Sequence, residues 1–331
     1  MFQISLKTAA LAAALAVAAA GLPSVQAAER LNLYTAQSSP QIVISRGLKR
    51  MADEVEKATN GELTIRIHQA GTLQIETSNI TGAVSQNIVQ MGDDLLFTGN
   101  VPLGGIQRLP FLVRSDEQAA STAKALAPFV EKEYASRGIT VLASYVSPPQ
   151  YVWGKEAVAK LDDLKGMKLR VSSPEQGEFV KRAGGIPITI SVPETAGALD
   201  RGMVDGVLTA GVGGGILWKD SLAHGYLLPV NYNNAHIIIN TKVFEGLSPE
   251  VQKTLRQAAT DAGQWIATNF KSEDDAVIKE IAAGKFTITE PTAEDIERAA
   301  KLMADYWDVW AKDRGPAAQE ALAAVRSAAG I

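Results

Sequence analysis

The sequence predicts an α/β protein of two domains, and three observations support this prediction. Behind residue 30, segments with strand-like and helical patterns alternate, which is typical of a largely parallel sheet covered by helices. The chain of 331 residues is longer than one average domain. A single helical pattern continues from Ser248 to about residue 284, and a helix about 50 Å long would extend beyond one domain.

The first 27 residues are predicted to be a secretory signal peptide. Lys7 supplies a positive charge, residues 8–22 are mainly apolar, and Ala27 ends a small-residue pattern of the kind that is cleaved on export. The apolar run is too short to span a bilayer, and no second run of about 18 apolar residues follows it. We therefore expect an exported protein that is not itself inserted in the membrane.

The composition excludes several classes of protein. With no cysteine, the chain cannot be a disulfide scaffold, a thiol enzyme or a thiolate metal site. Its 32 basic and 36 acidic residues give a net charge of −4, and there is no basic run. This balance argues against a nucleic acid as partner.

Residues 31–96 predict a first β-α-β-α-β series. Ser39 is the expected cap of the first helix, with Pro40 in its first turn, and Asn60-Gly61 is expected to end it. The expected elements, in order, are a strand at 31–36, a helix at 39–60, a strand at 63–68, a helix at 77–86 and a strand at 88–96.

The next part of the chain contains the expected crossing between the domains. Ser115 is the predicted cap of a helix that ends at Gly138, with Gln118 three residues after the cap, and a strand follows at 139–145. Residues 146–160 contain two adjacent prolines, and we expect an irregular interdomain segment there. A second series is then expected: a strand at 167–171, a helix at 174–183, a strand at 186–190, a helix at 194–201 and a strand at 204–208.

The remaining residues predict a return crossing and a helical C-terminal part. Residues 233–240 are expected to be a buried strand, and the long helix that begins after Ser248 is expected to lie across both domains. A short strand at 285–289 and helices at 293–311 and 316–328 follow. The expected boundaries are 28–148 with 236–275 for domain I, and 149–235 with 276–331 for domain II.

The sequence shows no obvious catalytic apparatus. His68, His224 and His236 are far apart, with no motif pairing them with an acid or nucleophile, and we expect them to be structural or surface residues. Neither a metal-ligand spacing nor a nucleophile-elbow motif is present. We therefore expect no cofactor, no metal and no enzymatic activity.

Two other features invite a chemical interpretation. The run GVGGG at 211–215 lacks the spacing of a phosphate-binding loop, so a flexible loop that lines a cleft is favoured. Asp93 and Asp94 could form a carboxylate pair, but adjacent strand residues point to opposite faces, and a solvated turn is favoured.

Arg170 is the strongest candidate for a functional residue. In its strand, Lys168 and Arg170 lie on one face and Met167, Leu169 and Val171 on the other. Arg170 lies at the carboxyl end of the strand, where ligands bind in open α/β sheets, and its guanidinium matches the two oxygens of a carboxylate. The pattern leaves open the alternative that Arg170 extends into solvent beside Lys168.

Aromatic residues gather near the proposed crossings. Core packing is the favoured interpretation of each one alone, but together they favour a cleft between the domains. They are Tyr145, Tyr151, Trp153, Trp218 and Tyr232.

Three blocks, at 108–119, 129–144 and 161–206, are similar in order and spacing to the solute-binding proteins of tripartite ATP-independent periplasmic (TRAP) transporters. The most specific is LKGMKLRV, residues 164–171. The resemblance implies a two-domain periplasmic binding protein of the Venus-flytrap type with crossing strands and a domain-spanning helix. It also implies a periplasmic location, a small organic acid as ligand, TRAP integral-membrane permease subunits as partners, and a salt bridge from Arg170 to the carboxylate of the ligand.

The sequence departs from the family pattern at the expected site. Many members have a second arginine where this chain has Gln150, and a polar run where it has Val207, Leu208 and Thr209. A second carboxylate on the ligand would need a second cation, so these departures favour a monocarboxylate with an apolar, aromatic, 2-oxo or 2-hydroxy body. A periplasmic enzyme or a sensory receptor for a small acid remains the alternative function.

The expected ligand contacts lie on strand-to-helix loops that face the cleft. In domain I they are Ser38, Ser39, Gln41, Glu76, Thr98 and Asn100. In domain II they are Gln150, Tyr151, Arg170, Thr209 and Trp218, with Asn234 near the return crossing.

Overall fold

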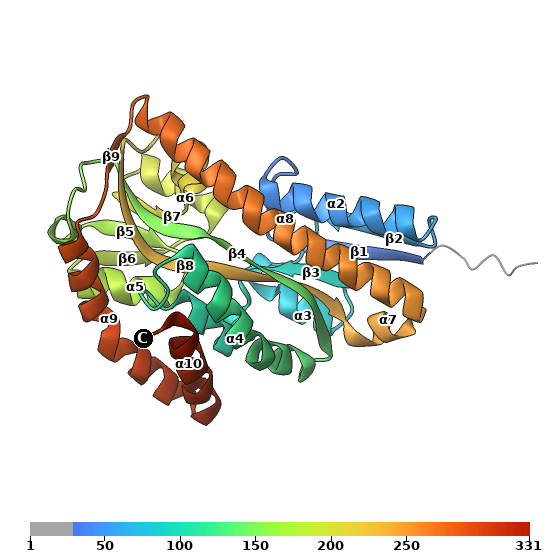
Figure 1. Cartoon of the computed structure of the whole chain (residues 1–331). Helices are drawn as coiled ribbons and strands as arrows, with labels where there is room; N and C mark the ends of the chain where they lie inside the picture. Colours follow the sequence, from blue (N-terminus) through green and yellow to red (C-terminus); the bar gives the residue numbers. More distant parts are fainter. Residues whose placement is uncertain (1–28) are drawn as a thin grey trace, which may run out of the picture.

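The computed structural model describes residues 29–331, and its strands form one nine-stranded mixed sheet (Figure 1). The expected signal peptide, residues 1–27, lies outside the described residues. The strands are β1 (Glu29–Thr35), β2 (Leu63–His68), β3 (Met91–Asp94), β4 (Ile139–Gly154), β5 (Lys168–Val171), β6 (Ile186–Thr189), β7 (Gly206–Thr209), β8 (His224–Asn240) and β9 (Thr287–Thr289).

Helices cover both faces of this sheet (Figure 1). The α-helices are α2 (Val43–Ala58), α3 (Ile80–Ser85), α4 (Asp116–Ala135), α5 (Pro174–Arg182), α6 (Val192–Asp200), α7 (Thr241–Gly246), α8 (Pro249–Ala282), α9 (Ala293–Arg314) and α10 (Pro316–Ala329). Three of the short helical turns are η3 (Pro102–Arg108), η4 (Leu161–Leu164) and η5 (Gly213–Leu217).

The sheet consists of two parallel series joined by a central antiparallel pair. Its order is β2-β1-β3-β8-β4-β7-β5-β6, with β9 paired to β8. β1 pairs in parallel with β2 and β3, and β5 pairs in parallel with β6 and β7. Both predicted series are thus present, and the predicted α/β class is confirmed.

The central pair, β4 and β8, crosses from one series to the other. β4 has 16 residues and β8 has 17, and they pair antiparallel over most of their length. The expectation of an irregular segment after residue 145 was wrong, because β4 continues to Gly154. Proline cannot donate a hydrogen bond, and the pair Pro148-Pro149 is tolerated because the register shifts between Val146 and Pro149.

α8 extends along both series, as expected from its length. It has 34 residues, which corresponds to about 50 Å, and Ser248 caps it by accepting a hydrogen bond from the Val251 N–H at 3.3 Å. Ile266 packs closely against Gly47 of α2, while Asp274 accepts a bond from the Val212 N–H at 2.7 Å next to η5. One helix therefore braces both halves of the sheet (Figure 1).

The start of α2 differs from the prediction. The helix begins at Val43 with Ile42 at its N-cap and no side-chain cap. Ser39 instead accepts a bond from the Gln41 N–H at 3.2 Å, so it stabilises a turn before the helix. The end of the helix is as expected, because Asn60 and Gly61 have φ values of 50° and 79°.

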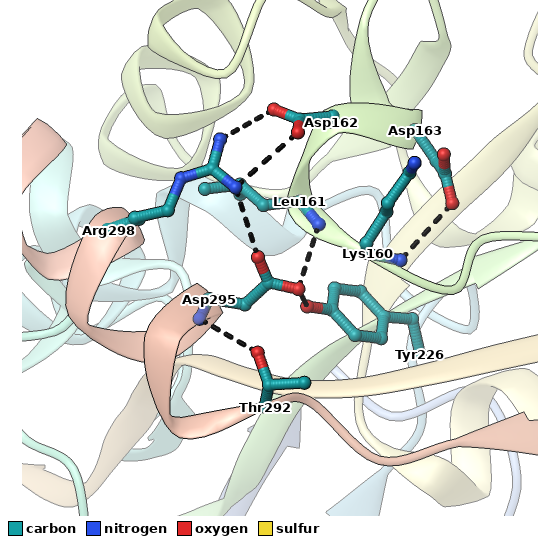
Figure 2. Close-up of polar contacts among 8 residues, drawn as sticks. All are labelled: Lys160, Leu161, Asp162, Asp163, Tyr226, Thr292, Asp295 and Arg298. Carbon is teal, nitrogen blue, oxygen red and sulfur yellow. Dashed lines mark hydrogen bonds and ion pairs between the residues drawn. The ribbon is translucent and has the colours of Figure 1, made fainter.

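The first turn of α9 is anchored by a buried carboxylate (Figure 2). Asp295 is 5% exposed and accepts bonds from the Tyr226 hydroxyl at 2.8 Å and from the Leu161 N–H at 3.3 Å. Arg298 bridges this carboxylate to Asp162 of η4. These contacts fix α9 against β8 and η4.

α10 packs against α4, which belongs to the other predicted domain. Gln118 donates from Nε2 to the Ala329 carbonyl at 2.8 Å, and Leu322 and Val325 are buried in the same core. The predicted domain boundaries place α10 with residues 276–331 of domain II. The C-terminal segment therefore contacts elements of both predicted domains.

We predict that Asp295→Asn lowers the free energy of unfolding by about 1–3 kcal/mol, because the amide carries no negative charge and its NH2 group would face the guanidinium of Arg298. Urea unfolding measures the change. Asp308→Asn is the matched control on α9, since it removes an exposed ion pair to Arg326 and should cost under about 1 kcal/mol. Equal losses in the two variants would contradict the anchoring role of Asp295.

Candidate ligand-binding site

Arg170 lies on the face of β5 opposite the main core. Leu169 and Val171 are buried in the core beneath α5 and α9, while Arg170 points to the other face. Its Nε donates to the Ile190 carbonyl at 2.9 Å, and its guanidinium carbon lies 5.7 Å from the centre of the Trp218 ring. Arg170 is only 5% exposed, so the alternative that it extends into solvent is excluded.

The charge of Arg170 is not neutralised by a described residue. Within residues 29–331 it forms no ion pair, and the Ile190 contact is its one hydrogen bond. Burial lowers the pKa of Arg170 to about 10, and no neighbouring charge contributes to the shift. The guanidinium therefore stays positive at neutral pH in a site that supplies no counter-charge.

A second buried arginine, Arg108, differs from Arg170 because the protein itself accepts its hydrogen bonds. Arg108, on η3, is 2% exposed; its Nε donates to Asn234 Oδ1 at 3.1 Å, and its Nη2 donates to the carbonyls of Asn234 and Leu95. Burial lowers its pKa to about 10, and this shift is opposed chiefly by the charge of Glu175. Arg108 is thus committed to the protein, whereas most donors of Arg170 are not.

Several predicted contacts lie on the same face as Arg170. In the strand register Arg170 pairs with Val207, which pairs with Trp153, and Thr209 pairs with Tyr151. Val207, Trp153 and Trp218 belong to one buried apolar cluster, with Tyr151 packed against it. The structure thus brings Tyr151, Thr209 and Trp218 to the face that carries the guanidinium.

Two other predicted contacts have different surroundings. Gln150 is 5% exposed, and its Nε2 donates to the Pro148 carbonyl at 3.0 Å. Asn234 accepts a bond from Arg108 and donates to the Gly104 carbonyl at 3.2 Å, so both ends of its amide are occupied. Contact of either side chain with a ligand stays a prediction.

The predicted contacts of domain I lie in loops after β1, β2 and β3, and within residues 29–331 no hydrogen bond or ion pair joins them to Arg170. Ser38, Gln41 and Glu76 are exposed. Ser39, Thr98 and Asn100 are half-buried. Their participation in ligand binding also stays a prediction.

A buried polar link, which the sequence reasoning did not identify, holds the strand end that carries Arg170. Gln176 Oε1 accepts bonds from the N–H and hydroxyl of Ser172 at 2.8 and 2.9 Å, and its Nε2 donates to Asn231 Oδ1 at 3.0 Å. The sequence pattern that could have identified Gln176 is the start of the helix, because Ser173 caps α5 and Gln176 is the third residue after this cap. This link ties the turn after β5 to β8.

The prediction of a flexible loop at 211–215 was wrong. A Cβ atom on Gly214 would lie 2.3 Å from the Trp153 ring, and one on Gly211 would lie 2.6 Å from Ile278. The segment is a buried helical turn whose glycines permit close packing of η5 against α8 and β4. Asp274 already accepts a bond from the Val212 N–H, so the segment offers no free phosphate cradle.

The prediction of a solvated turn at Asp93-Asp94 was also wrong. Both residues are fully buried in β3, and they face opposite sides of the sheet as expected. Asp93 accepts bonds from the hydroxyls of Tyr145 at 2.6 Å and Thr35 at 2.7 Å. Asp94 accepts from Thr81 and Tyr134, and burial raises the pKa of Asp94 to about 7.

Two of the histidines, His68 and His236, contact polar side chains of neighbouring strands. His68 Nε2 is 2.9 Å from Asn32 Oδ1, and the buried His236 has its Nδ1 2.7 Å from the Ser144 hydroxyl. Burial lowers the pKa of His236 to about 3, so its ring is neutral. Residues 29–331 contain no group of three or more histidine or acidic side chains that could hold a metal ion.

The comparisons with known proteins define the class. The model of the family "Bacterial extracellular solute-binding protein, family 7" matches residues 34–313, and the chain belongs to this family. It is a solute-binding protein of the TRAP type, and members of this family are solute receptors of transport systems rather than enzymes. Among residues 29–331, no helix is both long and apolar enough to cross a bilayer.

Individual relatives agree with this assignment. The 2,3-diketo-L-gulonate-binding periplasmic protein YiaO of Escherichia coli is 27% identical over 71% of this chain and 73% of its own length. The monocarboxylate 2-oxoacid-binding periplasmic protein of Nostoc sp. is 24% identical over 79% of this chain and 74% of its own. The crystal structure of DctP6 of Bordetella pertussis, which binds pyroglutamic acid, superimposes with a TM-score of 0.84 at 25% identity, covering 90% of this chain and 100% of DctP6.

We predict that Arg170→Met raises the free energy of unfolding of the ligand-free protein by about 1–3 kcal/mol, because it removes an unpaired buried charge. Chemical denaturation without ligand measures the change. Lys168→Met is the matched control on the same strand, and its exposed side chain should give a change within about 0.5 kcal/mol. A marked loss of stability in Arg170→Met alone would show that this arginine is structural.

We predict that Asp94→Asn stabilises the protein more at pH 8 than at pH 5. The pKa of Asp94 is raised in the folded state, so the stability it contributes is present below the pKa of the unfolded chain and is lost as the pH rises towards 7. Between pH 5 and 7 this is about 3 kcal/mol, at about 1.4 kcal/mol for each pH unit. Unfolding curves of both proteins at the two pH values give the difference, and a difference independent of pH would contradict this titration.

Proposed function

We propose that this protein captures a small organic monocarboxylate in the exported compartment through Arg170 and delivers it to a TRAP membrane permease. The ligand body is apolar, aromatic, 2-oxo or 2-hydroxy. Arg170 supplies the positive charge for the carboxylate, and Tyr151, Thr209 and Trp218 contact the ligand beside it.

One observation carries the proposal: Arg170 is buried and charged, and no described acid pairs with it. A buried cation without a partner costs free energy, and a bound anion recovers that cost. The planar guanidinium can hold both oxygens of one carboxylate, and Trp218 limits the positions that it can take.

The surroundings of Arg170 favour a ligand with one carboxylate. Val207 and Leu208, which replace polar family positions, are fully buried, so they present no second cation or amide at the strand end. Gln150 stands where many relatives have an arginine, and its amide is bonded to the backbone. The ligands named for the relatives, pyroglutamic acid and 2-oxoacids, each have a carboxylate on a small body.

The charge contact alone does not account for useful affinity. A charge-assisted hydrogen bond contributes about 1.5–3 kcal/mol, whereas micromolar binding requires about 8 kcal/mol. Burial of the ligand body must supply the rest, at about 25 cal/mol for each Å² of apolar surface. We infer that the two series of the sheet approach each other around the ligand, with the first-series loops that contain Ser38, Glu76 and Asn100 closing over it.

We predict that calorimetric titration with a panel of mono- and dicarboxylates gives the tightest binding for a monocarboxylate. Arg170→Ala should weaken that binding by at least about 100-fold, which corresponds to about 2.7 kcal/mol. Arg170→Lys should keep part of it, because an ammonium lacks the planar fork of donors.

Lys168→Ala is the matched control, because it removes an exposed cation from the same strand, and it should bind like the unaltered protein. A C4-dicarboxylate that binds best would contradict the choice of ligand class. Unchanged affinity in Arg170→Ala would contradict the role of the arginine itself.

A further inference from the structure

A cavity of about 310 Å³ lies where the crossing strands pass between α4 and α8. Its floor is formed by Ser144 to Pro148 of β4, together with Tyr232, Asn234 and His236 of β8. Neither Arg170 nor its contacts Ile190 and Trp218 line it. The cavity is thus distinct from the surroundings of Arg170, although it shares Asn234 with the predicted ligand contacts, and its volume lies at the lower end of the range found for small-molecule sites.

The two helices expose small side chains to this cavity. α4 contributes four alanines at helical spacing, Ala119, Ala120, Ala123 and Ala127, and α8 contributes Gly263 and Ala267. Interiors of proteins are close-packed, and larger side chains at these positions would fill the space. The empty volume is therefore a consequence of the residues that this chain has on the facing helices.

The charges at the cavity favour a neutral occupant. The only charged residues that line it, Asp116 and Lys271, form an ion pair at 3.3 Å, and Lys271 also pairs with Asp275 at 2.8 Å. No cation in the lining is left for a carboxylate. The buried Ser147 and the exposed Gln264 line the cavity, and either side chain can bond to a polar group of an occupant.

We propose that this cavity binds a small neutral molecule with an apolar body and one hydrogen-bonding group. The walls of alanine, Leu126 and Val130 contact the body, and Ser147 or Gln264 bonds to the polar group. An occupant of about ten non-hydrogen atoms suits the volume, with an affinity in the millimolar to micromolar range.

The position of the cavity couples its occupancy to motion of the two halves. Its floor includes Ser147 and Pro148, where the register between β4 and β8 shifts, and a sheet bends most readily where its ladder is interrupted. An occupant that contacts both strands and both helices binds more tightly to one bent conformation of the β4–β8 pair than to another. By linkage, it changes the affinity for a ligand whose binding requires closure. This coupling rests on the proposed function, whereas binding to the cavity does not.

The test uses indole as the neutral probe and amide chemical shifts of the isotopically labelled protein as the measurement. Indole should shift amides of residues 119–127, 144–148 and 263–271, and leave those around Arg170 unchanged. Ala267→Phe fills the cavity and should weaken indole binding at least about tenfold. Ala276→Phe, an exposed alanine of α8 outside the cavity, is the matched control and should bind indole normally, as should Arg170→Ala.

Shifts confined to residues near Arg170 and Trp218, or an absence of shifts at saturating indole, would overturn the proposal in the unaltered protein, whatever the folding of the variants. A smaller change, Ala123→Leu, gives a second test if Ala267→Phe does not fold, and unchanged indole affinity in it would also overturn the proposal. Coupling is tested by titrating the bound acid with and without indole: its affinity should change at least twofold, and an unchanged affinity would refute coupling while leaving the binding site in place.

Discussion

The site depends on one unpaired charge, the guanidinium of Arg170. Strand alternation buries Leu169 and Val171 on one side of β5 and sends Arg170 to the other, where the Ile190 carbonyl is its one bonded acceptor within residues 29–331. The bonds between Ser172, Gln176 and Asn231 hold the end of the strand, so the guanidinium cannot easily move to water. In the function that we propose, this arrangement favours binding, because burying an unpaired cation costs free energy and an entering anion would recover that cost.

The crossing strands β4 and β8 connect the series that carries Arg170 to the rest of the sheet. They join two parallel series into one sheet, and α8 packs along both series, so it holds the two halves together. In the function that we propose, the sheet bends near Pro149, where the register shifts. The buried carboxylates Asp93 and Asp94 lie at the end of β3 beside β8, where hydroxyl groups rather than cations donate hydrogen bonds to them. Burial raises the pKa of both carboxyls, and the bonds from the hydroxyl groups oppose that shift.

Local patterns in the sequence predicted the elements well, because caps and strand alternation depend on nearby residues. Ser115, Ser173 and Ser248 cap the helices they were expected to cap, and the alternation of strand and helix patterns predicted both β-α-β-α-β series. The errors occurred where tertiary contacts decide the structure. The adjacent prolines Pro148 and Pro149 predict an irregular segment, whereas a register shift lets the strand continue through them. The glycines at 211–215 predict a flexible loop, whereas α8 packs on them. The burial of Arg170 could be proposed from its strand position, but the contacts of Asn234 with Arg108 could not, because these residues are far apart in the sequence.

The most direct test of the account is a crystal structure of the protein with the monocarboxylate that it binds most tightly, in which the distances from the Arg170 nitrogens to the ligand oxygens are measured. The account predicts two contacts between guanidinium nitrogens and one carboxylate at about 2.7–2.9 Å, with the Trp218 ring beside them. A carboxylate held by other residues, with Arg170 still bonded only to the Ile190 carbonyl, would contradict it.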